Sequence, residues 1–234
     1  MLELTPVLRI TVLTGAGISA ESGIRTFRAS DGLWEDHRIE DVATPEAFQR
    51  DPALVQRFYN MRRADAARAQ LNAAHRALAQ LAGRCQLTLI TQNVDDLHER
   101  GGSPAVIHMH GRLNGALCAA CDRRWTAPAI MSHMDACPGC GAAATRPDIV
   151  WFGEIPCQMD DIWAAVETAD VFAAIGTSGQ VYPAAALAQH ARRHGAETVE
   201  LNIAASAVSR DFTRHLTGPA TRIVPEWVAG ILQS

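Results

Sequence analysis

The sequence has no excess of basic charge, because 21 Lys and Arg residues stand against 25 Asp and Glu residues, for a net charge of −4. A protein that binds nucleic acid by neutralising phosphates needs a basic surface, so the composition argues against a nucleic-acid partner. No apolar run approaches the roughly 20 residues of a membrane-spanning helix. The first residues also lack the basic start and cleavage site of a secretory signal and the Arg- and Ser-rich pattern of an organelle presequence. We therefore expect a cytoplasmic protein with no membrane partner.

The rest of the composition suits one large domain, since the chain has 234 residues and 48% of them are hydrophobic. Apolar runs of strand length alternate with stretches of helical periodicity. This alternation predicts an α/β fold, and the apolar runs suit strands buried on both faces of a parallel sheet. The expected strands are 7–13, 86–91, 105–109, 171–175, 198–202 and 221–224, and the expected helices are 73–81, 162–168, 183–193 and 206–215.

Two stretches interrupt the alternation and divide the chain. Residues 36–72 have a helical, polar pattern without a strand, and residues 115–146 are rich in Cys, Gly, Pro and Ala. We interpret them as two insertions that form a smaller domain, one a helical insertion and the other a zinc-binding module. The remaining residues, 1–35, 73–114 and 147–234, then form a Rossmann-like nucleotide-binding domain.

A glycine-rich turn follows the first expected strand. Gly15, Gly17 and Ala20 have the spacing G-x-G-x-x-A of a dinucleotide-binding turn, in which Gly17 would let a pyrophosphate approach the backbone. A dehydrogenase would supply a second apolar strand ending in Asp or Glu about 20 residues later. The interval "TFRASDGLWEDHRIED" contains no such strand, so the sequence disfavours hydride transfer.

Four of the six cysteines form two pairs, Cys118-x2-Cys121 and Cys137-x2-Cys140, separated by fifteen residues. This spacing matches a structural zinc site, with a redox pair as the alternative. Four thiolates complete a tetrahedral shell and leave no position for a catalytic water, so the metal is expected to be structural. The other two cysteines, Cys85 and Cys157, lack partners in sequence and are expected to be ordinary buried thiols in a reducing compartment.

Polar residues follow two neighbouring strands. Gln92, Asn93 and Asp95 come at the carboxyl end of the strand 86–91, where α/β folds bind ligands. Asn93 and Asp95 either hydrogen-bond a ribose or an amide, or cap the helix that follows. His110 ends the next strand and is a candidate general base, and His108, on the same face of that strand, is its rival.

These segments together resemble a known family. "GAGISAESGIRTFR", "TQNVD", "HMHG", the four cysteines, "VWFGE" and "GTS" occur in the order found in sirtuins, the NAD-dependent protein lysine deacylases, and the resemblance covers nearly the whole chain. It implies that NAD is consumed as a co-substrate and that the chain holds one structural Zn. It also implies acyl-lysine proteins or peptides as substrates, with nicotinamide and O-acyl-ADP-ribose as products, and a phosphate turn that leads into a loop around the nicotinamide and ribose.

The resemblance assigns roles to individual residues. His110 is implied as the base that acts on a ribose hydroxyl. The segment Val150, Trp151, Phe152, Gly153 and Glu154 is implied to pair with the substrate peptide by strand addition. The residues implied to bind NAD are Gly15, Ala16, Gly17, Ser19, Ala20, Glu21, Ile24, Thr26, Phe27, Arg28, Trp34, Gln92, Asn93, Asp95, Gly176, Thr177, Ser178, Asn202, Ile203, Ala204 and Ala220.

The segment "RFYNMRR" narrows the subclass. Tyr59 and Arg62 stand three residues apart, on one helix face, and resemble the Tyr-x-x-Arg of class III sirtuins, the desuccinylase and demalonylase type, in a bacterial-like member. The pair would grip an acyl carboxylate; the alternative is a solvated helix face with one aromatic ring in the core. We therefore expect both deacetylase and desuccinylase activity. The alternative function is a zinc-ribbon module that only senses NAD. The sequence does not fix the oligomeric state, and we expect a monomer.

Overall fold

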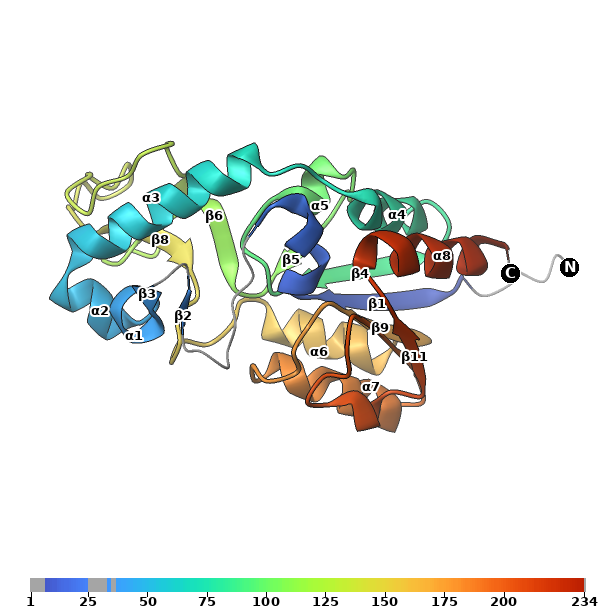
Figure 1. The fold of residues 1–234 in the computed structure, drawn as a ribbon. Coiled ribbons are helices and arrows are strands. Elements are labelled where there is room, and N and C mark those ends of the chain that lie inside the picture. Colours follow the sequence, from blue (N-terminus) through green and yellow to red (C-terminus); the bar gives the residue numbers. More distant parts are fainter. Residues whose placement is uncertain (1–6, 25–32, 35–36, 234) are drawn as a thin grey trace, which may run out of the picture.

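The computed structural model describes residues 7–24, 33–34 and 37–233, and of 33–34 the backbone alone. Figure 1 shows two parts, a parallel sheet with helices on both faces and a smaller body at the other end of the long helix α3 (Pro52–Arg68). The sheet has the order β11-β10-β9-β1-β4-β5, and all of its pairings are parallel. The predicted Rossmann-like fold class is therefore confirmed.

The carboxyl ends of the central strands meet at one edge. Strand β1 (Arg9–Thr14) lies between β4 (Gln86–Thr91) and β9 (Val171–Ile175), and Thr14 pairs with the last residue of each neighbour. From β1 the order runs outward to β5 (Ile107–His108) on one side and to β10 (Glu197–Asn202) and β11 (Arg214–Thr217) on the other. The strand order reverses at β1, and ligands of open α/β sheets bind at such a point.

Helices cover both faces of the sheet (Figure 1). The helices α4 (Ala73–Leu81) and α8 (Ala220–Gln233) bury one face, and α6 (Met159–Glu167) and α7 (Leu187–Arg193) bury the other. Single-turn segments connect them: η1 (Ala16–Ile18), η2 (Ala20–Ser22), α5 (Leu97–Arg100), η3 (Ala184–Ala186) and η4 (Ser209–Asp211). Among the described residues, no helix combines the length and the apolar character needed to cross a lipid bilayer.

Two expectations about the last third of the chain are wrong. Residues 221–224 belong to α8, and the edge strand is instead β11, whose first two residues fall within the predicted helix 206–215. Ile223, Val224, Trp227 and Val228 are buried at helical spacing, but Pro225 interrupts the run and obscures the helical pattern. Strand β11 is at the edge and mostly exposed, so its sequence carries no apolar run.

The smaller body joins both insertions. Helices α1 (Ile39–Val42), α2 (Pro45–Arg50) and α3 pack with an antiparallel sheet of order β7-β6-β8, made of β6 (Gly111–Cys118), β7 (Arg124–Thr126) and β8 (Thr145–Ile149). The capping residues Thr44 and Asp51, each followed by Pro, start α2 and α3. A short hairpin of β2 (Leu33–Trp34) and β3 (His37–Arg38) precedes α1. The helical insertion, residues 36–72, therefore contains one short strand, β3, that was not predicted.

Candidate active site

A pocket of about 940 Å³ lies at the carboxyl edge of the sheet, against α3 and the segment after β8. Every predicted NAD or substrate residue within the described part of the chain lines it, from Gly15 at one end of the sequence to Ala220 at the other. Thr26, Phe27 and Arg28 lie outside the described residues, and the side chain of Trp34 is likewise outside them. The structure therefore brings the described candidates together in one cavity, of a size suited to a dinucleotide.

The glycine turn is closed by backbone contacts with the loop after β9. The amides of Gly15 and Gly17 donate to the carbonyls of Ile175 and Gly176 at 2.9 and 2.8 Å. A Cβ on Gly15 would lie 2.8 Å from the Gly176 oxygen, and one on Gly17 would lie 2.7 Å from the Gly176 Cα. These glycines are thus required by the neighbouring loop, before any ligand is considered. The turn continues into η1 and η2 and not into the long helix of a dehydrogenase.

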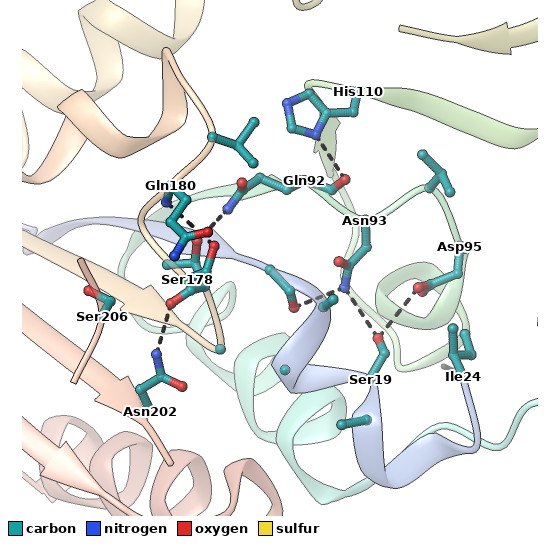
Figure 2. Close-up of a pocket in the computed structure, with 18 of the residues that line it drawn as sticks. Ser19, Ile24, Gln92, Asn93, Asp95, His110, Ser178, Gln180, Asn202 and Ser206 are labelled. Carbon is teal, nitrogen blue, oxygen red and sulfur yellow. Dashed lines mark hydrogen bonds between the residues drawn. The ribbon is translucent and has the colours of Figure 1, made fainter. Parts of the chain in front are cut away.

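Polar side chains tie the loops together (Figure 2). Asn93 Nδ2 donates to the Gly15 carbonyl at 3.1 Å, and Ser19 Oγ donates to Asp95 Oδ2 at 3.4 Å. Asp95 Oδ1 also accepts from the Leu97 amide at 3.1 Å, so Asp95 both binds the first amide of α5 and lines the pocket. Burial raises the pKa of the Asp95 carboxyl.

The loop after β9 is held from two sides (Figure 2). Gln92 Nε2 donates to Thr177 Oγ1 at 3.0 Å, and Asn202 Nδ2 donates to the Thr177 carbonyl at 2.8 Å. Sequence reasoning missed the pocket residues just beyond the predicted ones, among them Gln180, Val181, Tyr182 and Ser206. Only their position in the sequence could have indicated them, because they follow β9 and β10 at the same carboxyl edge of the sheet.

His110 and His108 have different surroundings. His110 lines the pocket, and its Nδ1 lies 3.1 Å from the Gln92 carbonyl. A carbonyl only accepts, so Nδ1 carries the hydrogen and Nε2 keeps the lone pair of a base. Burial lowers the pKa of His110, against a smaller opposing effect of the Gln92 hydrogen bond, so the ring is neutral at neutral pH.

His108 is instead buried and does not face the pocket. Its two ring nitrogens lie 3.1 Å from the Asn93 carbonyl and 2.7 Å from Glu99 Oε1, and it is absent from the residues that line the cavity. The expectation that His108 and His110 share one strand face is wrong, because β5 ends at His108 and the strand alternation does not extend to His110.

Tyr59 and Arg62 both line the pocket and are both buried, with 0% and 4% of their surface exposed. The solvated helix face is therefore excluded. Tyr59 Oη accepts from Trp151 Nε1 at 3.1 Å, and burial raises the pKa of the phenol, so it stays protonated and is a hydrogen-bond donor. The side chain of the neighbouring Arg63 binds a different part of the protein, since its Nε donates to the Leu113 carbonyl at 2.7 Å.

The segment from Val150 to Glu154 follows β8 as a turn and not as a strand. The amides of Val150 and Phe152 donate to the carbonyls of His110 and Ala43, both at 3.0 Å. Glu154 accepts two bonds from Arg146, at 2.7 and 2.9 Å, and that guanidinium lies 3.6 Å from the centre of the Trp151 ring. The turn is thus fixed before any peptide arrives.

The four paired cysteines fit a zinc ion. Their sulfurs all lie within 4.8 Å of one another, and the distances Cys118–Cys140 and Cys121–Cys137 are both 3.7 Å. A tetrahedron with Zn–S bonds of about 2.3 Å requires sulfurs about 3.8 Å apart. The amides of Ala120 and Gly139 point at the sulfurs of Cys118 and Cys137. The predicted metal-binding cluster therefore exists as a set of four free thiols, with no disulfide among them.

The two remaining cysteines are unpaired, as expected, but are half-buried and not fully buried. Burial raises the pKa of both the Cys85 and Cys157 thiols, so neither is activated as a thiolate.

Fold and site together define a Rossmann-type nucleotide-binding protein with a zinc module attached. The sequence matches the Sir2 family over residues 15–183, and the chain belongs to that family, the sirtuins. Among its relatives, an NAD-dependent protein deacylase of Vibrio cholerae is 54% identical over 97% of this chain and 94% of its own length. A protein of the same name from Escherichia coli K12 is 53% identical over 96% of this chain and 82% of its own length.

Solved structures agree with this assignment. A Sir2 homologue in complex with NAD has a TM-score of 0.87 and 41% identity, over 96% of this chain and 89% of that one. A Sir2 complex with a p53 peptide and NAD⁺ has a TM-score of 0.80 and 28% identity, over 96% of this chain and 94% of that one.

Proposed function

We propose that this chain is an NAD-dependent protein lysine deacylase that removes acetyl and succinyl groups and releases nicotinamide and O-acyl-ADP-ribose. The observation that carries the proposal is His110, whose basic Nε2 belongs to a single cavity shared by the glycine turn and by Arg62. The two relatives described above are named NAD-dependent protein deacylases, and related structures bind NAD and a p53 peptide. We further propose a monomeric, cytoplasmic protein.

The loops at the sheet edge would hold NAD. The turn from Gly15 to Glu21 and the loop from Gly176 to Ser178 would bind the phosphates, since both present backbone around the same cavity. Asn202, Ile203, Ala204 and Ala220 would lie against the adenosine, and Gln92, Asn93 and Asp95 against the ribose and nicotinamide. Asn93 and Asp95 are buried and already oriented by Ser19, so they would meet the co-substrate without rearrangement.

His110 would act as a general base. When bound, NAD supplies a ribose that loses nicotinamide and accepts the acyl group. His110 Nε2 would take the proton from a ribose hydroxyl, while the Gln92 carbonyl keeps the hydrogen on Nδ1 and fixes the orientation of the ring. Because burial lowers the pKa of His110, the ring would be ready to accept a proton at neutral pH.

The zinc module and the turn after β8 would complete the substrate side. The four thiolates would hold one structural Zn. The substrate peptide would lie along the segment from Val150 to Glu154, which lines the cavity. The amides of Val150, Trp151 and Phe152 already donate hydrogen bonds within the protein, and these bonds hold the segment in place. Arg62 and Tyr59 would bind the carboxylate of a succinyl group, a role supported by a guanidinium buried at the cavity wall.

The test is to mix the protein with NAD and acetyl- or succinyl-lysine peptide and to follow nicotinamide and acyl-ADP-ribose by mass spectrometry. All 21 cationic side chains of this chain are Arg, so the peptide is the only source of lysine. Release of both products with peptide present is the expected result. Saturable NAD binding without turnover would support an NAD-sensing module instead, and a change at the reduced nicotinamide absorbance would indicate a dehydrogenase.

A further inference from the structure

A second group of metal-binding side chains lies on the face of the sheet covered by α6 and α7 (Figure 1). Glu167 is the last residue of α6, His190 is in α7, and His194 caps the end of α7. One ligand atom from each lies within 4.8 Å of the others. Both helices are anchored in the same hydrophobic cluster, so the three side chains are brought together by the fold.

The two imidazoles are arranged as ligands. Residues four apart on a helix project from the same side, and the ring centres of His190 and His194 are 4.4 Å apart. His194 Nδ1 lies 3.0 Å from the His190 carbonyl, so Nδ1 carries the hydrogen and the lone pair is on Nε2. The His190 ring packs edge-on against Trp163 at 4.8 Å, which limits its rotation.

The carboxylate completes the set. Glu167 Oε1 accepts a hydrogen bond from His190 Nε2 at 3.0 Å, so without an ion that nitrogen carries the hydrogen that a bound metal would replace. Two imidazoles and one carboxylate suit a borderline divalent transition metal and not Mg²⁺ or Ca²⁺, which prefer oxygen ligands. We propose that Glu167, His190 and His194 bind one such ion, for which Zn²⁺ is the natural occupant, with water in the remaining coordination position.

This site differs from the four-cysteine site in what holds the metal. Glu167 and His194 are exposed and His190 is half-buried, so an ion held by these three ligands would be open to water and would exchange with solvent. Four thiolates instead complete the coordination shell of the structural ion. Arg192, two residues from each histidine, is directed away, since its guanidinium donates to the Arg210 carbonyl at 3.0 Å. The proposal does not depend on the proposed deacylase function.

The test is zinc stoichiometry in the intact protein with its four-cysteine site filled. Equilibrium dialysis against micromolar Zn²⁺, with metal counted by mass spectrometry, should give one further ion per chain. His194→Ala and Glu167→Gln should each weaken this second equivalent by at least about tenfold, and circular dichroism should show both variants folded.

His215→Ala is the matched control, because His215 Nδ1 also pairs with a carboxylate, that of Glu200 at 3.0 Å, but within the described part of the chain belongs to no three-ligand group. It should retain the second ion. A wild-type protein that takes up no second ion, or a folded His194→Ala variant that binds it as tightly as the wild type, would overturn the proposal.

Discussion

One end of the pocket is formed by backbone and the other by side chains. At the glycine end, which comprises Gly15, Gly17, Gly176 and Thr177, backbone packs on backbone and none of the three glycines has space for a Cβ. At the arginine end, which comprises Tyr59, Arg62 and Trp151, buried side chains form the wall. At the glycine end, the backbone fold itself determines the shape of the pocket. At the arginine end, single substitutions can change the pocket wall, so acyl specificity can vary there.

The two ends are also supported by different parts of the molecule. The glycine end rests on the six-stranded sheet. The arginine end rests on α3, which is tied to the zinc module by side chains that reach across: Gln56 donates to the Thr145 carbonyl at 3.0 Å and Asn60 to the Met131 carbonyl at 2.8 Å. Loss of the zinc module should therefore damage one end and spare the other.

The largest expected effect is that of zinc removal or of Cys137→Ala. Structural zinc contributes about 10–16 kcal/mol of apparent binding free energy in isolated fingers, so its loss should unfold the module and abolish deacylation. ADP-ribose should still bind to the sheet edge. Near-ultraviolet circular dichroism and calorimetry with ADP-ribose measure the two outcomes. If a chelator stopped turnover while the circular dichroism stayed native, the metal would be catalytic.

The next effect is that of His110→Ala, which should lower kcat by about 10²–10⁴-fold while ADP-ribose binding persists. Because burial lowers the pKa of His110, the acid limb of kcat/KM in the wild type should fall below the usual histidine value, and the variant should lack it. His108→Ala is the comparison variant: it removes the bond to the Asn93 carbonyl, so it should lower the melting temperature and reduce turnover less. An active His110→Ala beside a dead His108→Ala would reverse the assignment.

Many of the residues at the two ends of the pocket could be predicted from the sequence, for reasons that differ between the ends. The strands β4 and β9 were predicted with their observed bounds because buried parallel strands are continuous apolar runs. The residues that follow such strands share one edge of the sheet, which is why the strand pattern predicted Gln92 as a ligand-binding residue, whereas Gly176 was assigned through the family resemblance. The edge strand β11 was missed because half-exposed strands carry no such run.

What the sequence could not supply are contacts between side chains far apart in the chain. Trp151 and Tyr59 are 92 residues apart, and no local pattern predicts their hydrogen bond. The resemblance proposed Gly17 as a phosphate contact, and the structure adds that its missing Cβ is demanded by Gly176. The pairing of Glu167 with His190 and His194 likewise required two helices to be packed together.

The third effect concerns acyl choice at the arginine end. Arg62→Met keeps the length of the side chain but removes the guanidinium, and a charge-assisted bond is worth about 1.5–3 kcal/mol, so kcat/KM for succinyl peptide should fall about 10- to 150-fold. Turnover of acetyl peptide should change little. Arg57→Met is the control, because Arg57 is exposed on the same helix, and it should leave both substrates unaffected. An equal loss on both substrates would mean that Arg62 supports the helix and does not bind the acyl group.

A comparable or smaller effect should follow from Gly17→Ala, which tests the glycine end. A Cβ at 2.7 Å from the Gly176 Cα would force the two loops apart. Overpacking of this kind costs about 1–3 kcal/mol, so ADP-ribose affinity should weaken about 5- to 150-fold. The ratio of succinyl to acetyl turnover should not change. Gly83→Ala, where a Cβ would meet nothing within 4 Å, is the control for calorimetry, and unaltered affinity in Gly17→Ala would show that the loops can yield.

The smallest effect is expected for Tyr59→Phe, and it separates two roles of one hydroxyl. The phenol accepts from Trp151 Nε1 inside the core, so its loss leaves that N–H unsatisfied and should lower stability by about 1–3 kcal/mol. Because burial raises its pKa, the phenol also stays protonated and is a hydrogen-bond donor at the cavity wall. One neutral hydrogen bond is worth about 0.5–1.5 kcal/mol, so the ratio of kcat/KM for succinyl over acetyl peptide should fall about 2- to 12-fold. Thermal unfolding and the two kinetic constants must be measured on the same preparation. A lower melting temperature with an unchanged ratio would show that Tyr59 only holds Trp151 in place, and that Arg62 alone reads the carboxylate.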